Sequence, residues 1–170
     1  MDMPLMDAKS TDVSSSAQTG RIGAADAQLV IGGWVRHPLR LTADALRAYP
    51  TRLVDFQVVC TWDGAHGGPR RMRGVAVRDL ILEADPAFEG RTDFKRVAIV
   101  AEAAEGYRAL FSWGEVFNTT VGDGVLIVFD DADAPVARDA GPFALISEHD
   151  RFTGPRFVRG LAMVELVKLW

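Results

Sequence analysis

Short hydrophobic runs separated by turn-forming residues fill the chain from Gln28 onward. Runs of this kind, bounded by Gly, Pro, Asp or Ser, are typical of β-strands. The Gly32-Gly33 pair inside the first run indicates a bend or a bulge, and Glu105-Gly106 indicates a turn between two strands. The pattern predicts strands at 29–35, 53–60, 97–102, 107–112, 125–129, 142–147 and 160–169.

Two segments have helical spacing instead. Thr42 is a typical N-cap and Pro50 a typical stop, which predicts a short helix over 43–49. Within 75–84, four apolar residues recur at positions i, i+3, i+4 and i+7, the stripe of an amphipathic helix. Residues 113–118 are expected to form a helical turn. We therefore predict an α+β fold, a single mixed-sheet domain with more strand than helix.

The first 27 residues lack apolar periodicity and are dominated by Ser, Asp, Gly and Ala. This predicts a disordered N-terminal tail over 1–27, followed by one domain over 28–170. A secretory signal needs a basic start and then about 7–15 apolar residues, whereas Asp2 and Asp7 flank a short apolar run here. We expect a cytoplasmic location, or a periplasmic one if a signal has been removed. Residues 130–141 are expected to form a polar connection between two strands.

Composition narrows the class of protein further. The chain has 170 residues, 48% hydrophobic and 25% charged, which fits one globular domain with or without a tail. Its single cysteine excludes an intrachain disulfide. The net charge of −4 argues against nucleic-acid binding through bulk charge. No run of about 18 apolar residues occurs, so we expect no membrane span.

Cys60 closes the predicted strand 53–60 and precedes a Gly-rich, basic segment, 61–73, that we expect to be a loop. A lone cysteine at the end of an apolar strand is most often a small buried hydrophobe. The loop suggests more, because glycines let a backbone approach a ligand closely and arginines match phosphate oxygens. A thiolate also suits a soft or redox-active metal. The alternatives are a site for an anionic cofactor with one thiolate ligand and a solvated surface loop. The candidate residues are Cys60, Thr61, Trp62, Asp63 and Arg70.

A second basic cluster lies in SEHDRFTGPRFVRG, between the last two predicted strands. If those strands neighbour the strand of Cys60, both basic segments emerge on one rim of the fold. The alternative is again a solvated loop. The cationic residues of this cluster are His149, Arg151, Arg156 and Arg159.

Other motifs find no support in the spacing. Gly122-Asp123-Gly124 precedes a strand rather than a helix, so it is not a dinucleotide fingerprint. Neither a Walker A sequence nor an HExxH pair occurs. The acidic residues that begin at Asp130 lack the Gly and distal Glu of a calcium loop, so they are expected to form a solvated turn. Nothing in the spacing selects Cys60 with a histidine as a nucleophile–base pair.

Five segments occur in a definite order between residues 28 and 167. They are VIGGWVRHPLRLTADALRAYP, then VDFQVVC before a glycine-bearing loop, then RMRGVAVRDLI, AEAAEGYRALFSWGEV and GPFALISEHDRFTGPRFVRGLAMVEL. Together, with the cysteine in register, they resemble the molybdopterin-binding domain of the sulfite oxidase superfamily, and the chain resembles a small stand-alone member. The resemblance implies the α+β fold of that domain.

The resemblance also implies roles for particular residues. Cys60 would be the thiolate ligand of molybdenum in a molybdopterin cofactor, with the other sulfur ligands supplied by the pterin dithiolene. Arg156 and Arg159, in PRFVRG, would contact the pterin or its phosphate, and Tyr107, in EGY, would lie near the metal. Since the chain has no haem or flavin motif, electrons would leave to a separate redox partner.

Two further hypotheses remain open. Glu148 and the lack of companion domains favour a metal-free pterin-binding module with a sensory or regulatory role and a signalling partner. There Trp62, Phe152 or Phe157 would stack on the pterin ring, and Asp63 or Glu148 would accept hydrogen bonds from its amino-pyrimidine edge. The last hypothesis is a protein interaction module with no small ligand.

Overall fold

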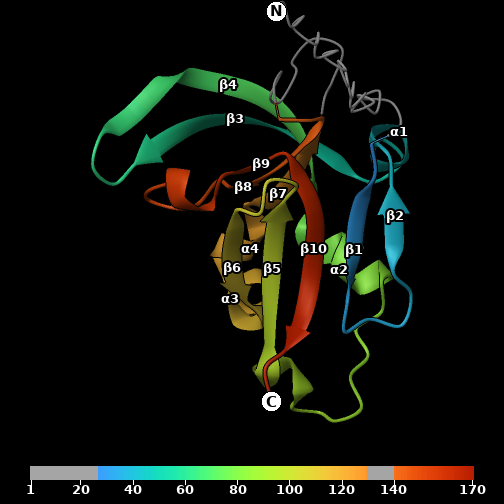
Figure 1. The fold of residues 1–170 in the computed structure, drawn as a ribbon. Helices are drawn as coiled ribbons and strands as arrows, with labels where there is room; N and C mark the ends of the chain where they lie inside the picture. The colour runs from blue at the N-terminus through green and yellow to red at the C-terminus, as the bar shows by residue number, and fades with distance from the viewer. Residues whose placement is uncertain (1–26, 130–139) are drawn as a thin grey trace, which may run out of the picture.

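The structure is a computed structural model that describes residues 27–129 and 140–170. Two five-stranded sheets form its framework (Figure 1). The first sheet has the order β2-β1-β10-β5-β6 and the second has the order β3-β4-β7-β8-β9. The strands of the first sheet are β1 (Leu29–Gly33), β2 (Leu39–Leu41), β5 (Val97–Ala103), β6 (Arg108–Ser112) and β10 (Leu161–Lys168). Those of the second are β3 (Thr51–Cys60), β4 (Gly64–Ala76), β7 (Val125–Phe129), β8 (Phe143–Ser147) and β9 (Val158–Arg159).

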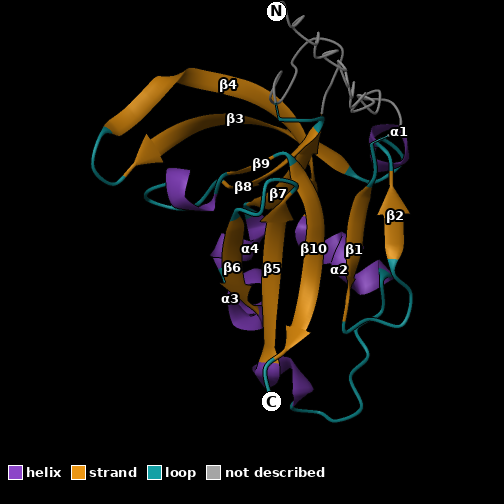
Figure 2. Ribbon diagram, viewed as in Figure 1, coloured by secondary structure: helices purple, strands orange, loops and turns teal. Residues whose placement is uncertain are grey.

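Short helices connect these strands, and α2, α3 and α4 lie behind the first sheet in Figure 2. The α-helices are α1 (Ala43–Leu46), α2 (Val77–Glu83), α3 (Trp113–Asn118) and α4 (Thr120–Asp123). The 3-10 helices are η1 (Asp93–Arg96) and η2 (Gly154–Arg156). Among the described residues, no helix combines the length and hydropathy needed to span a bilayer. The expected cytoplasmic location stays a prediction.

The first sheet is mixed and the second is antiparallel throughout its described pairs. β1 and β10 are parallel, with Val30 opposite Met163, and the other pairs of the first sheet are antiparallel. The predicted class, α+β with more strand than helix, is confirmed, and the structure adds that the strands are divided between two sheets. The predicted tail lies outside the described residues except for Ala27, which packs against the core. Residues 130–139 of the predicted connection also lie outside them.

A main core takes apolar residues from both sheets and from α2 and α3. Alternate residues of β7, such as Ile127, point into this core. The residues between them, such as Leu126 and Val128, face a second cluster that includes Phe56 and Met72 of the β3–β4 hairpin. Both faces of β7 are therefore covered, which explains why its sequence is a continuous apolar run.

The helical stripe in the sequence predicts α2 well. Val77, Leu80 and Ile81 are buried in the main core, and Ala84, just after the helix, is buried as well. Thr42 caps α1 as expected, since its hydroxyl accepts a hydrogen bond from the Ala45 N–H (3.2 Å). The first strand ends at Gly33, whose φ of +82° explains why a glycine stands at that position.

The prediction of a loop over 61–73 was wrong, because residues 64–76 form β4. β4 pairs with β3 from Val75 to Gly64, but with β7 only over Gly74–Ala76. The remainder of the hairpin extends beyond the sheet as a long curved ribbon, which we call the β3–β4 arm (residues 54–72; Figure 1). Most of β4 in the arm is solvent-exposed, so it lacks the alternating burial that marks a strand in sequence.

Candidate functional site

Cys60 is the last residue of β3, at the outer end of the β3–β4 arm. It lies opposite Gly64, across a turn made by Thr61, Trp62 and Asp63. The Trp62 side chain is 93% exposed, whereas Cys60 is half-buried and has a free thiol. The thiol is thus at the outer end of the arm, two residues before an exposed tryptophan.

A loop from the other end of the chain lies against this part of β3. We call residues 148–157 the strap. The register of β3 with β4 shifts between Phe56 and Val58, and Thr153 of the strap meets β3 at this irregularity. Its Oγ1 accepts a hydrogen bond from the Val59 N–H (2.8 Å) and donates one to the Gln57 carbonyl (2.6 Å). Thr153 of the strap therefore bonds backbone groups of β3, the edge strand of the second sheet.

Gly154, the next residue of the strap, lies beside the Cys60 sulfur. A Cβ at this position would be 3.0 Å from Cys60 Sγ and 3.2 Å from the Val59 carbonyl oxygen. A side chain here would crowd the thiol, so the glycine keeps the space beside the sulfur open.

The strap is fixed to the first sheet by polar contacts. The Tyr107 hydroxyl donates a hydrogen bond to the Pro155 carbonyl (2.6 Å). Arg156 Nη1 donates to Glu115 Oε1 on α3 (2.9 Å), and Arg156 Nε donates to Asp150 Oδ2 (2.6 Å). The Arg156 guanidinium also lies 4.4 Å from the centre of the Phe111 ring. Tyr107 and Arg156 thus hold the strap between the two sheets.

The charges of this network stabilise one another. Hydrogen bonds to Asp150, and then to Glu115, raise the pKa of Arg156. Burial alone would raise the pKa of Glu115, but hydrogen bonds from Ser112 and Arg156 outweigh it and hold that pKa below its usual value. A cofactor phosphate at Arg156 would have to compete with two carboxylates that already occupy its donors.

The other predicted site residues have separate surroundings. His149 Nδ1 is 2.6 Å from the Thr120 carbonyl oxygen, and the Arg151 guanidinium lies 5.5 Å from the centre of the Phe152 ring. Phe157 packs against the Phe56 ring in the second cluster, with ring centres 5.4 Å apart. Arg70 is exposed on β4, opposite Phe56.

Arg159 lies in a different part of the second sheet from the thiol. It is opposite Ala144, in a row that continues through Val128 and Gly74 to Arg52. Arg52 is eight positions before Cys60 on β3. The structure therefore brings Cys60 together with the strap, and the strap together with Tyr107, while Arg159 belongs to another row. The predicted roles of these residues stay predictions.

Sequence reasoning missed Thr153 and Gly154. Thr153 is 7% exposed, and its hydrogen-bond partners are 94 and 96 residues away in sequence. Only the Thr-Gly-Pro sequence within a basic loop could have drawn attention to them, as a turn that begins with a hydroxyl side chain.

The described side chains could supply one thiolate to a metal cofactor, but they form no complete metal site of their own. Within 27–129 and 140–170, no three His, Cys, Asp or Glu side chains gather closely enough to hold a metal ion. A metal held wholly by protein side chains therefore has no site among these residues. A metal whose other sulfur ligands come from a dithiolene needs only one thiolate from the protein. Cys60, half-buried with a glycine beside its sulfur, fits that requirement.

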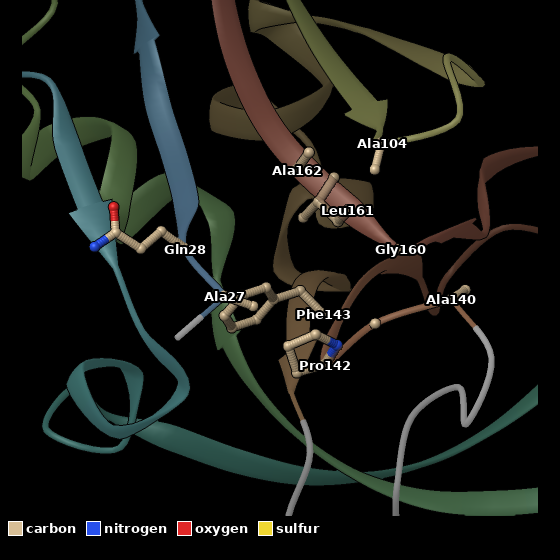
Figure 3. Close-up of a pocket in the computed structure, with 10 residues that line it drawn as sticks. Ala27, Gln28, Ala104, Ala140, Pro142, Phe143, Gly160, Leu161 and Ala162 are labelled. Carbon is tan, nitrogen blue, oxygen red and sulfur yellow. The ribbon is translucent and has the colours of Figure 1, made fainter. Parts of the chain in front are cut away.

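Two hollows of the described surface lie elsewhere. One, of about 440 Å³, is lined mainly by small and apolar residues, among them Pro142, Phe143 and Leu161, where β1, β8 and β10 meet (Figure 3). The other, of about 400 Å³, lies at the base of the β3–β4 hairpin and includes Arg52 and Arg78. Both arginines are already paired with carboxylates, Glu148 and Asp123 respectively.

Comparison with known proteins gives a likeness in structure. No protein-family model matches the sequence, and no curated protein matches it. Among solved structures, 19 chains match. One is the sulfane dehydrogenase SoxCD from Paracoccus pantotrophus, with a TM-score of 0.62 and 19% sequence identity. The alignment covers 86% of this chain and 39% of that chain.

The likeness is one of fold. At this level of identity, side-chain roles do not transfer from one protein to the other. The present chain also spans less than half the length of the chain that it matches. The α+β fold with two sheets is thus shared with part of an enzyme that is a dehydrogenase by name.

Proposed function

We propose that this chain is a cofactor-binding domain of the oxidoreductase type, in which the Cys60 thiolate ligates the molybdenum of a molybdopterin cofactor. The observation that carries the proposal is the position of Cys60, half-buried at the end of β3 with Gly154 beside its sulfur. The fold shared with part of a sulfane dehydrogenase supports it. The resemblance of five ordered segments to the sulfite oxidase superfamily supports it independently.

The residues of the chain would bind and orient the group. Cys60 would supply one thiolate, and Gly154 would leave room beside it. Arg151 on the strap is the candidate for the phosphate, because two carboxylates already pair with Arg156. Trp62, exposed at the turn, would cover the pterin or contact a redox partner. When bound, the cofactor would supply two-electron or oxygen-atom transfer at the metal.

The test is the metal and pterin content of the full chain, produced in a host that synthesises the cofactor. We expect molybdenum and pterin each near one per chain, with molybdenum lost in Cys60→Ala. Val59→Ala is the matched control, because it truncates the neighbouring side chain on the same strand and should keep its molybdenum. Wild type without molybdenum, or Cys60→Ala with a full complement, would overturn the proposal.

The second candidate is a metal-free pterin-binding module with a signalling partner. Two observations favour it, namely the pairing of Arg156 with carboxylates and the full exposure of Trp62 next to Asp63. An exposed indole offers a face for ring stacking, and a carboxylate accepts hydrogen bonds from an amino-pyrimidine edge. Pterin without molybdenum, retained in Cys60→Ala and lost in Trp62→Ala, would establish this reading. A preparation that takes up neither would leave a protein interaction module.

A further inference from the structure

Thr153 replaces a missing strand beside Cys60. β3 is the edge strand of the second sheet, so no strand of the described residues pairs with its outer side. A carbonyl and an N–H two residues apart on a strand point to the same side. The Gln57 carbonyl and the Val59 N–H form such a pair, and the one hydroxyl of Thr153 bonds both, at 2.6 Å and 2.8 Å.

The hydroxyl is held firmly enough to act as a fixed point. Thr153 is buried, at 7% exposure. On its C-terminal side, the Pro155 carbonyl accepts the Tyr107 hydroxyl (2.6 Å) and Arg156 bonds Glu115 on α3 (2.9 Å). These contacts tie the strap to Tyr107, the residue before β6, and to α3. Thr153 therefore links the outer end of the β3–β4 arm, through the strap, to residues next to the first sheet.

We propose that Thr153 is a positioning residue that fixes the Cys60 thiol over Gly154. Its two hydrogen bonds hold the β3 backbone at residues 57–59, and Cys60 is the next residue. Because Gly154 follows Thr153 directly, the same contacts set the space between the strap and the sulfur. A role of Thr153 in metal binding rests on the proposed function. Its positioning of the Cys60 thiol does not.

The test measures the reactivity of the thiol in the full chain, produced in a host that cannot make the cofactor. Since Cys60 is the single cysteine, its alkylation rate with iodoacetamide at fixed pH is unambiguous. Thr153→Val keeps the shape and removes both hydrogen bonds. We expect it to raise the rate about tenfold, the effect of losing hydrogen bonds of ordinary strength. Thr153→Ser, which keeps the hydroxyl, should restore the wild-type rate.

Two further variants make the result decisive. Thr42→Val removes the cap of α1 and should lower the thermal midpoint without changing the alkylation rate. Tyr107→Phe frees the Pro155 carbonyl and should raise the rate by a smaller factor, which keeps the test open if Thr153→Val fails to fold. Wild-type rates in both Thr153→Val and Tyr107→Phe, or failure of Thr153→Ser to restore the rate, would overturn the inference. Faster alkylation of Thr153→Val, together with no molybdenum in wild type from a host that synthesises the cofactor, would support the positioning and refute the metal.

Discussion

Gly154 leaves space beside the Cys60 sulfur because it has no side chain. At Gly154, even a methyl group would stand 3.0 Å from the thiol and 3.2 Å from a backbone oxygen. By contrast, a Cβ at Gly68, on the arm, would have no neighbour within 4 Å. A side chain would therefore be crowded at Gly154 but not at Gly68.

Asp93 gives the fold a dependence on pH. Its carboxylate accepts hydrogen bonds from the N–H groups of Gly90 (2.8 Å) and Glu89 (2.9 Å), which hold its pKa below the usual value. Because the folded state favours the charged form, this stabilisation is complete above the unfolded pKa, about 4. It is lost as the pH falls through the lowered folded pKa.

Replacing Asp93 by Asn should therefore lower the free energy of unfolding at pH 7, and the difference from wild type should narrow below about pH 4. Urea unfolding at a series of pH values measures this difference. Asp55→Asn is the control, since Asp55 forms an exposed ion pair with Arg71, and such pairs contribute little. A gap for Asp93→Asn as wide at pH 3 as at pH 7 would show that the carboxylate charge is not the cause.

Residue-level prediction from sequence succeeded where the signal is local. Cys60 was expected at a strand end, and it is there. Thr42 was expected as a cap, and its hydroxyl is bonded as a cap. Thr153 and the pairing of Arg156 with Glu115 were beyond reach, because their partners are distant in sequence and no spacing rule relates them. A basic loop looks the same in sequence whether or not its arginines are already neutralised.

At the scale of elements, α3 begins with a reciprocal pair of hydrogen bonds. The Ser112 hydroxyl accepts from the Glu115 N–H (3.1 Å), and Glu115 Oε2 accepts from the Ser112 N–H (2.8 Å). Two backbone donors that the helix itself leaves free are thereby satisfied. Since Glu115 also bonds Arg156, the start of α3 is a point where helix and strap meet.

Ser112→Ala should reduce the free energy of unfolding by about 1 kcal/mol, because it removes the cap of a short helix. Chemical denaturation of the full chain measures this loss. Ser112→Asp should retain most of the stability, because a carboxylate caps as well as a hydroxyl does. If alanine and aspartate have the same effect, the hydroxyl does not act as a cap.

Elements were predictable where apolar residues recur at a helical period or form a continuous run. The apolar stripe of α2 and the apolar runs of β5, β7 and β10 predicted the positions of these elements to within a few residues. β4 was taken for a loop because Gly67, Gly68 and Pro69 stand in it and most of its side chains face solvent. β4 is a strand because it pairs with β3. Such pairing depends on two segments, so the sequence of β4 alone does not reveal it.

At the scale of the whole molecule, the core shared by the two sheets makes us expect them to unfold together. Residues of both sheets lie in one buried cluster, so neither sheet keeps its apolar face covered without the other. Trp34 and Trp113 both contact the Phe88 ring at inclined angles and pack against this cluster, whereas Trp62 and Trp170 are exposed. Tryptophan fluorescence therefore reports on the core near α3, and circular dichroism reports on all strands.

We expect the two signals to change at the same urea concentration, as one cooperative transition. Trp62→Phe should reduce the background fluorescence without moving the midpoint, because that ring makes no buried contact. Separate midpoints for fluorescence and circular dichroism would mean that the sheets unfold independently.

The parallel pairing of β1 with β10 has a consequence for biosynthesis. Until Leu161–Lys168 leaves the ribosome, the first sheet lacks its middle strand and consists of β2-β1 on one side and β5-β6 on the other. At translation rates, β1 waits on the order of ten seconds for this partner. A product that stops before Leu161 exposes two unpaired strand edges, which can pair with another chain and aggregate. The strand order thus makes synthesis of β10 a condition for a complete first sheet.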